Sequence, residues 1–460
     1  MTTGPTRDAW LQAVAGVLKG APLETLRWHL PGGAAIEPLY PRAAGAAPVI
    51  GRPPGTRWRI VQRVDHPDAG EANALALADL EGGADGLTLV LAGAAAARGF
   101  GLAAPDIDTL ERALDRVELD LITLRLDAGA AAPAAAASLL ALAQRRGLAA
   151  GRLAISIGYD PVGILAAQGR LPPEGAVGEL VAALERAGHA GPALTADGRP
   201  YHEAGASGSQ ELAAVLATGL AHLRVLEKAG LTLEQAARRI DFVLAADADI
   251  VLTLSKFRAL RRLWARVEAA CGLRPEPACL HAETAWRMLA RRDPPTNMLR
   301  GTIAAFAAGL GGADSIGVLP FTAALGLPDA FARRVARNAQ HELMAEANLH
   351  RVTDPAAGAG TFEAVTDMLC TEAWAMFQAI ERQGGAIAAL LSGWLQDEIA
   401  AGLAGAPEPV IVGTTRFALA HEAETAVLAP APPAPVADGG LDGRPLPARR
   451  AAEPFERVSP

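Results

Sequence analysis

From Arg57 onward, short apolar runs alternate with longer segments in which apolar residues recur at helical spacing. This alternation is typical of repeated β/α units with parallel strands. We predict strands at 58–64, 86–91, 119–124, 154–158, 193–196, 241–245, 278–281 and 315–319. We predict helices at 69–81, 108–116, 134–145, 177–187, 209–229, 251–270, 297–310 and 330–347, and two further helices at 361–384 and 387–402.

Eight alternating units predict a (β/α)8 TIM barrel, because closing the sheet removes both of its exposed edges. An open doubly wound sheet is the structural alternative, since alternation alone fits both folds. Such a sheet usually carries a Gly-rich phosphate turn after its first strand. Here the first predicted strand runs instead into Asp65, His66, Pro67 and Asp68. The pattern therefore favours the barrel.

The chain divides into three predicted parts. Residues 1–54 hold an amphipathic helix near Trp10–Leu18 and an extended Pro-rich arm, which cannot bury its own apolar face and is expected to lie on a partner subunit. Residues 55–404 form the barrel and its packing helices. Residues 405–460 are rich in Ala, Pro and Gly without periodicity, and are predicted to form a disordered linker or tail.

Composition excludes several classes of protein. Apolar residues make up 51% of the chain, enough for a large core, and a net charge of -8 gives no electrostatic footprint for nucleic acid. The three cysteines form neither a disulfide framework nor a CxxC metal site. No signal peptide or membrane-spanning run is evident. We therefore expect a cytoplasmic protein that binds neither nucleic acid nor membranes.

Two short stretches could carry chemistry at the barrel mouth. Tyr201 and His202 follow the fifth predicted strand, and His281 and Glu283 lie just past the seventh, on the face where barrel enzymes place their catalytic groups. Each histidine can equally be a structural residue satisfied by the loop backbone. Two potential ligands at i and i+2 are too few for a catalytic metal site, so no bound metal is predicted.

Other motifs are absent or have a simpler interpretation. No GxGxxG turn, P-loop or GxSxG elbow is present, so neither nucleotide binding on a Gly-rich loop nor a serine hydrolase is supported. Five basic residues fall at helical spacings on one predicted helix, and we interpret them as a solvated outer face: Lys256, Arg258, Arg261, Arg262 and Arg266. The residues alone thus indicate a barrel with an unidentified site.

Several longer stretches occur in one order over about 400 residues: WLQAVAGVLKG, IEPLY, EAGAS, RRDPPTN, FARRVARNAQHEL and RVTDPAAGAGTFEAVTDML. This pattern resembles the catalytic-domain pattern of the adenosylcobalamin-dependent acyl-CoA mutases, above all the methylmalonyl-CoA mutases. The resemblance implies a barrel along whose axis the CoA arm of the substrate threads. It also implies a separate C-terminal domain in which a DxHxxG histidine ligates cobalt.

The chain departs from the family pattern at the cofactor. It contains no DxHxxG, and AAEPFERV at 451–458 resembles the segment that precedes the cobalamin domain, so we expect the chain to stop where that domain begins. The two positions expected to hold the adenosyl ribose carry Leu319 and Ala323. No cofactor-binding residue is therefore expected in this chain.

The resemblance places further substitutions in the active site. The Tyr-His pair expected four residues before EAGA is replaced by Arg199 and Pro200, with Tyr201 and His202 displaced by two positions. A second active-site tyrosine is replaced by Arg63, and a glutamine of the seventh-strand loop by Glu283. No catalytic residue is expected, and the remaining candidates for substrate contact are Tyr201, His202 and His281.

DGRPYHEAGA resembles the small-subunit form of the motif in heterodimeric mutases. The chain is thus expected to be a non-catalytic small subunit that stabilises a large catalytic subunit. The complex would interconvert (R)-methylmalonyl-CoA and succinyl-CoA with adenosylcobalamin bound by the partner. Two alternatives stay open: a catalytic barrel that works with a separately encoded cobalamin domain, and a regulatory barrel that binds a CoA ester.

Overall fold

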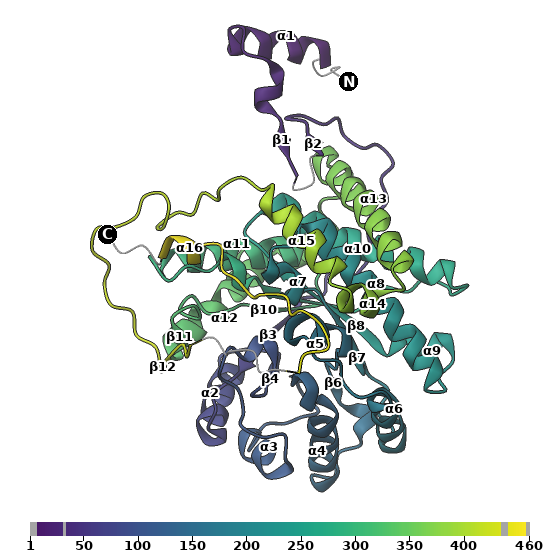
Figure 1. Cartoon of the computed structure of the whole chain (residues 1–460). Coiled ribbons are helices and arrows are strands. Elements are labelled where there is room, and N and C mark those ends of the chain that lie inside the picture. Colours follow the sequence, from purple (N-terminus) through teal and green to yellow (C-terminus); the bar gives the residue numbers. More distant parts are fainter. Residues whose placement is uncertain (1–6, 31–33, 434–439, 457–460) are drawn as a thin grey trace.

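The computed structural model describes residues 7–30, 34–433 and 440–456. The first six residues, the centre of the Pro-rich tail segment and the last four residues, including the end of AAEPFERV, lie outside this description. The described chain forms a barrel with surrounding helices, and the N-terminal arm extends away from it (Figure 1). No helix among these residues is long and apolar enough to cross a bilayer.

Eight parallel strands form one sheet in the order β6-β5-β4-β3-β10-β9-β8-β7. Their bounds are β3 (Arg59–Val64), β4 (Gly86–Val90), β5 (Thr123–Asp127), β6 (Ala154–Ser156), β7 (Leu194–Asp197), β8 (Ile240–Ala246), β9 (Leu280–Thr284) and β10 (Ser315–Gly317). A parallel bridge between Tyr159 and Leu194 joins the two edges of the sheet. Thr195 N also donates to Tyr159 O at 3.1 Å, so backbone pairing continues across the seam. The predicted (β/α)8 TIM barrel is confirmed.

Two strands lie further along the chain than predicted. The third runs Thr123–Asp127 instead of 119–124, and the seventh runs Leu280–Thr284 instead of 278–281. Both carry charged residues at alternate positions, and these residues point into the barrel. A strand whose inward face is charged interrupts the apolar run that the sequence pattern relies on.

The helices that cover the barrel match the predicted segments closely. They are α2 (Ala69–Glu81), α3 (Ile107–Ala113), α4 (Ala132–Arg145), α6 (Ala176–Ala187), α8 (Gly208–Lys228), α10 (Ile250–Ala270), α11 (Thr296–Leu310) and α12 (Ala330–Ala345). The carboxylates of Asp68, Asp249 and Asp329 cap helix N-termini by accepting backbone N–H groups, which fixes where these helices begin. Ser207 and Gln210 form a capping box at the start of α8.

Further helices, most of them short, occupy the loops and the outside of the barrel. They are α5 (Pro161–Gln168), α7 (Arg199–Ala204), α9 (Leu233–Arg238), α13 (Gly360–Arg382), α14 (Ala386–Leu391), α15 (Trp394–Ala404) and α16 (Glu453–Glu456). The helix predicted at 387–402 is therefore two helices. Gly393 separates them with a φ of +81°, a left-handed conformation that glycine adopts without strain.

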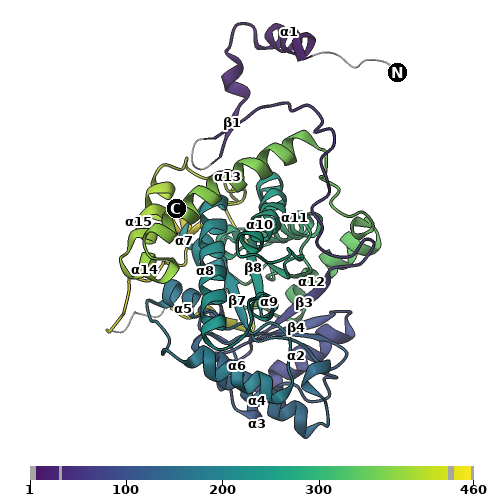
Figure 2. The same cartoon turned by 90° about the vertical axis from the view of Figure 1, so that its right-hand side faces the viewer.

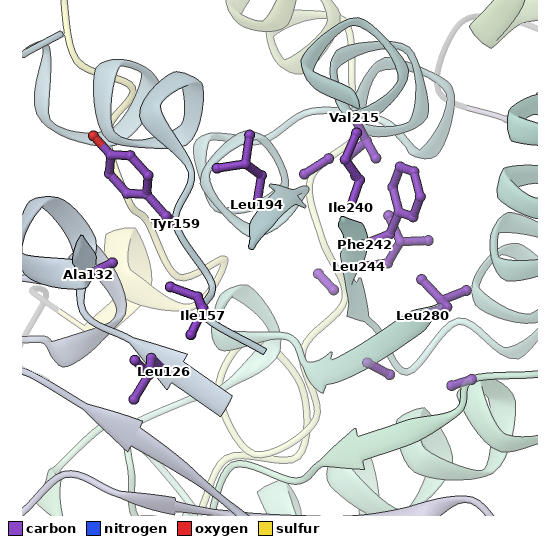
Figure 3. Packing of buried hydrophobic residues seen from close by; sticks show 14 of the residues in the cluster. Leu126, Ala132, Ile157, Tyr159, Leu194, Val215, Ile240, Phe242, Leu244 and Leu280 are labelled. Carbon is purple, nitrogen blue, oxygen red and sulfur yellow. The ribbon is translucent and has the colours of Figure 1, made fainter. Parts of the chain in front are cut away.

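The core lies between the barrel strands and the helices. Figure 3 shows apolar side chains at this interface, including Leu126 of β5 and Phe242 of β8. Phe242 meets Trp264 of α10 edge to face at a centroid distance of 4.8 Å. Aliphatic and alanine side chains fill this layer between strands and helices. The apolar core therefore lies outside the sheet, and the space inside the barrel can hold polar groups.

The N-terminal arm begins with α1 (Arg7–Leu18), followed by the turn η1 (Leu23–Leu26) and the two-stranded pair β1 (Trp28–His29) and β2 (Ala35–Ile36). No residue of α1 is buried. Figures 1 and 2 show α1 standing away from the barrel in both views. The arm thus leaves the predicted amphipathic helix outside the barrel core.

The tail differs from the predicted disordered segment. β12 (Ala429–Pro430) pairs with β11 (Gly326–Leu327), and Ile411, Leu446 and Arg450 are buried against the rest of the chain. Backbone N–H groups of the tail donate to barrel carbonyls. The tail holds few bulky apolar residues, so its apolar pattern does not indicate this order, to which backbone hydrogen bonds and the Arg450–Glu456 pair contribute.

Candidate functional site: the barrel axis

Side chains of alternate strand residues point into the barrel, and here many of them are polar. Arg125 of β5 reaches Asp241 of β8, with Nη1 and Oδ2 2.7 Å apart. Ser156 donates to the same carboxylate at 2.7 Å, and Thr195 also donates to it. β5 and β8 are not neighbours in the sheet, so this contact crosses the interior. Asp241 is completely buried, and its charge is balanced within this layer.

A second group of charges lies nearer the carboxyl ends of the strands. We call it the axial plug: Arg63, Asp65, Asp127, Asp197, Arg199 and Glu283. Glu283 of β9 binds Arg63 of β3 at 2.9 Å and Arg199, at the start of α7, at 3.0 Å. Arg199 further contacts Asp197 at 2.6 Å and Asp127 at 3.0 Å. The plug therefore joins four strands across the end of the barrel where active sites of this fold are built.

Burial and pairing determine the protonation of the plug. Burial raises the pKa of Glu283, but Arg199 and Arg63 outweigh this effect and hold that pKa well below its usual range. Burial raises the pKa of Asp197 to about 6 despite its contact with Arg199. Burial lowers the pKa of Arg199, yet its carboxylate neighbours raise it above the ordinary value. Glu283 and both arginines are thus charged and paired at neutral pH.

The sequence-based candidates are found in different places. Tyr201 is fully buried in α7, with its hydroxyl 3.4 Å from Thr218 Oγ1, so it does not face the axis as a free proton donor. Its neighbour Pro200 is a half-buried residue of the same short helix. The position of Pro200 at a helix start explains why this residue is tolerated there.

His202 lies in a buried charge cluster behind the mouth. Its Nδ1 is 3.4 Å from Glu211 and its Nε2 is 3.2 Å from Asp247. Burial, together with Lys256 and Arg287, lowers the pKa of His202 well below the usual value. Lys256 also binds Glu211, at 2.5 Å. His202 therefore lies between two carboxylates, although its Nε2 forms no hydrogen bond with the described residues.

His281 and Glu283 are not loop residues as predicted but lie within β9 itself, together with Thr284. His281 Nδ1 is 2.8 Å from Ser315 Oγ, and burial lowers the pKa of its imidazole. The structure brings His281 and Glu283 onto the same inner face of the barrel. It does not bring Tyr201 to that face.

The two positions that the resemblance assigns to the adenosyl ribose, Leu319 and Ala323, carry apolar side chains. Leu319 is buried in the apolar core, and its backbone N–H already donates to Thr284 Oγ1 at 2.8 Å. Ala323 packs against the same core. Neither side chain can form a hydrogen bond, so neither could hold a ribose hydroxyl. Among the described residues, no group of three or more His, Cys, Asp or Glu is arranged to hold a metal ion.

Sequence reasoning missed part of this interior. Arg125, Asp127, Asp197 and Asp241 are not among the sequence-based candidates. Only Asp241 falls within a predicted strand, and the other three lie just past the ends of predicted strands. The predicted solvated face on α10 is wrong for Arg258, which is 1% exposed and binds Asp354 at 2.9 Å. Lys256 and Arg261 are likewise buried: Lys256 pairs with Glu211 of α8, and Arg261 donates to the carbonyls of Ala278 and Gly312.

The fold and the interior together define a (β/α)8 barrel whose axis holds ion pairs that span it. The sequence profile described as methylmalonyl-CoA mutase matches residues 52–432. The chain therefore belongs to the methylmalonyl-CoA mutase family.

Relatives of this chain include proteins named as small subunits. The methylmalonyl-CoA mutase small subunit of Streptomyces virginiae is 42% identical over 95% of this chain and 74% of its own length. The small subunit of Propionibacterium freudenreichii subsp. shermanii is 36% identical over 84% of this chain and 64% of its own length. The methylmalonyl-CoA mutase of Escherichia coli is 29% identical over 86% of this chain and 62% of its own length. The chain thus spans from about three fifths to about three quarters of these relatives.

Proposed function

We propose that this chain is the non-catalytic small subunit of a heterodimeric methylmalonyl-CoA mutase. The large subunit binds adenosylcobalamin and interconverts (R)-methylmalonyl-CoA and succinyl-CoA in the cytoplasm, and the small subunit stabilises it. The names of the similar proteins support the role of a small subunit. This chain contributes its barrel surface and its arm to the complex, and does not contact the substrate.

The axial plug is the observation that carries this proposal. In the family that the chain resembles, the CoA arm passes along the barrel axis. Here Arg199 and Glu283 meet at 3.0 Å in that space, and both are largely buried. Opening the axis would separate buried charges from their partners, which typically costs about 3–5 kcal/mol for one pair. The binding free energy of a CoA arm would have to offset this cost.

Leu319, Ala323 and the axial plug count against the two alternative functions. A catalytic barrel with a separate cobalamin domain needs polar groups for the adenosyl ribose, and Leu319 and Ala323 offer none. A regulatory barrel that holds a CoA ester along its axis needs the space that the arginines and carboxylates occupy. The non-catalytic role requires neither feature.

The arm supports assembly with a partner. Trp10, Leu11, Val14 and Leu18 recur at helical spacing on α1 and are half-buried, whereas Val17 on another face is 80% exposed. An apolar stripe on a helix that stands off the barrel gains stability when a second protein covers it. We therefore assign α1 to the interface with the large subunit.

Reconstitution with the large subunit tests the proposal. We expect co-expression with this chain to raise the yield and thermal stability of the large subunit, and the complex to turn over at the same rate when Arg199→Ala is introduced here. Trp10→Ala should weaken association in analytical ultracentrifugation, and Ala13→Ser on the exposed side of α1 is the matched control. A large subunit that is equally stable and active alone, or turnover lost in Arg199→Ala at equal complex content, would refute the proposal.

A further inference from the structure

The mouth of the barrel is bordered by a segment of the tail, residues 440–456, which we call the clasp. It runs past α7 toward α5 in Figure 1. Its backbone N–H groups donate to carbonyls that follow three different strands: Leu446 to Ala166 at 2.7 Å, Arg449 to Glu203 at 3.0 Å and Ala451 to Arg287 at 2.8 Å. The clasp therefore follows the rim from the end of β6 past β7 to the end of β9.

Buried side chains hold the clasp in place. Leu446 is 5% exposed and packs into the main core, and Arg450 is also 5% exposed. Arg450 binds both carboxylate oxygens of Glu456, at 2.9 and 2.6 Å, and donates to Leu289 O at 3.3 Å. The bidentate pair lies within the clasp, and the bonds from Arg450 to Leu289 O and from Arg291 N to Glu456 attach this end of the clasp to the segment after β9.

An ion pair crosses the mouth beside the clasp. Arg98, in the loop after β4, binds Glu203 of α7 at 2.5 Å and lies over the ring of Trp286 at 3.9 Å. Arg98 has a left-handed backbone with a φ of +53°, which is uncommon for a residue other than glycine and indicates that its surroundings fix it. Glu203 is also the residue whose carbonyl accepts the N–H of Arg449, so the crossing pair and the clasp share one anchor.

We propose that the clasp and the Arg98–Glu203 pair lock the carboxyl-terminal mouth of this barrel, and thereby exclude a docking protein domain from it. The carboxyl-terminal face of the fold is then restricted by the clasp along its rim and by the ion pair across it, and α7 carries both Glu203 of the pair and Arg199 of the axial plug. The consequence for the complex rests on the proposed function: with two related barrels present, a cobalamin-bearing domain can dock productively only on the partner. The clasp and the Arg98–Glu203 pair direct the domain to the partner because they close the mouth of this barrel and leave the mouth of the partner barrel open.

Limited digestion of the isolated full-length chain tests the lock without any partner. Trypsin can cut after Arg449 and Arg450, and the Lys19–Gly20 bond in the exposed arm serves as an internal reference. We expect cleavage in the clasp to be at least tenfold slower than at Lys19. Arg450→Ala should release the segment and raise cleavage after Arg449 at least tenfold, with the barrel still folded by circular dichroism.

Hydrogen exchange supplies the second measurement and keeps the test decisive if Arg450→Ala fails to fold. The amides of Leu446, Arg449 and Ala451 should be protected in the native chain, and Glu456→Gln, which retains side-chain size, should reduce their protection. Arg444→Ala is the matched control, because Arg444 pairs with Asp397 at the exposed surface of the same segment. Clasp amides that exchange as in a free peptide in the native chain would overturn the inference. Because no partner is used, such a failure leaves the proposed subunit role to its own test.

Discussion

The sharpest perturbation of this barrel is Glu283→Gln, which removes one charge from the axial plug and keeps the side-chain volume. Glu283 is 3% exposed and accepts hydrogen bonds from Arg63 and Arg199 at 2.9 and 3.0 Å. The amide can accept from one guanidinium, but its NH2 group then faces the other. Two buried cations thus lose the carboxylate that lies between them.

The expected cost follows from what each arginine keeps. Loss of one partner of a buried ion pair typically costs about 3–5 kcal/mol. Arg63 retains Asp65 at 3.3 Å and Arg199 retains Asp197 at 2.6 Å, so we expect the lower end, about 3 kcal/mol. This corresponds to a change of roughly a hundredfold in the unfolding equilibrium. The cost should shrink as the pH falls below about 4, because the low pKa of Glu283 stabilises the fold only while the unfolded carboxyl is ionised.

Urea denaturation followed by tryptophan fluorescence measures this difference. The control is Glu111→Gln, which breaks an exposed pair with Arg145, where both side chains are more than two fifths exposed. An exposed pair contributes about 0–1 kcal/mol. If the free energy of unfolding of Glu283→Gln lay within about 1 kcal/mol of that of the native chain, the ion pairs of the plug would not oppose opening of the axis, and the reasoning from the plug would fail.

Three further changes test other parts of the structure. Asp197→Asn should remove a pH-dependent loss of stability. Because burial raises the pKa of Asp197 to about 6, the native chain should lose about 2 kcal/mol of stability between pH 4 and pH 7 that the variant does not lose. Urea denaturation at both pH values measures this difference, and parallel pH profiles for the two proteins would contradict it. His281→Gln should remove a loss of stability as the pH falls below about 6.5, since the lowered pKa of the native imidazole means that the unfolded chain binds the proton; thermal melts at pH 7 and 5 decide. Ser207→Ala should cost about 1 kcal/mol by removing the cap of α8, and Ser207→Thr, which keeps the hydroxyl, should restore most of it in the same melts.

The sequence predicted the architecture well where apolar and polar positions follow a clear period. The helix predicted at 69–81 is α2, and the helices predicted at 251–270 and 297–310 begin within one residue of α10 and α11. Caps such as Asp68 and Asp249 lie next to these starts, so local hydrogen bonding and the apolar pattern agree. The two displaced strands are those with inward-facing charges, where the same pattern is interrupted.

The candidate site was only partly predictable. Arg63, Arg199 and Glu283 were singled out because they replace residues of the family pattern, and the structure brings all three into contact. Asp197 lies two positions before Arg199, within DGRPYHEAGA, but Asp127 lies outside every stretch that resembles the family. Nothing in the linear sequence therefore connects Asp127 with Arg199. Closing the barrel brings together residues more than seventy positions apart.

What the sequence alone determined is the repeated β/α alternation, the helix starts and the family to which the chain is similar, because these depend on local spacing and on residues read in order. What only the tertiary structure decided is which charges neutralise each other. Glu283 could be a free acid on a loop or a paired group inside a barrel, and its 2.9 and 3.0 Å contacts with two arginines make it the latter. Electrostatic energy depends on distance in space, and only the closed barrel sets those distances.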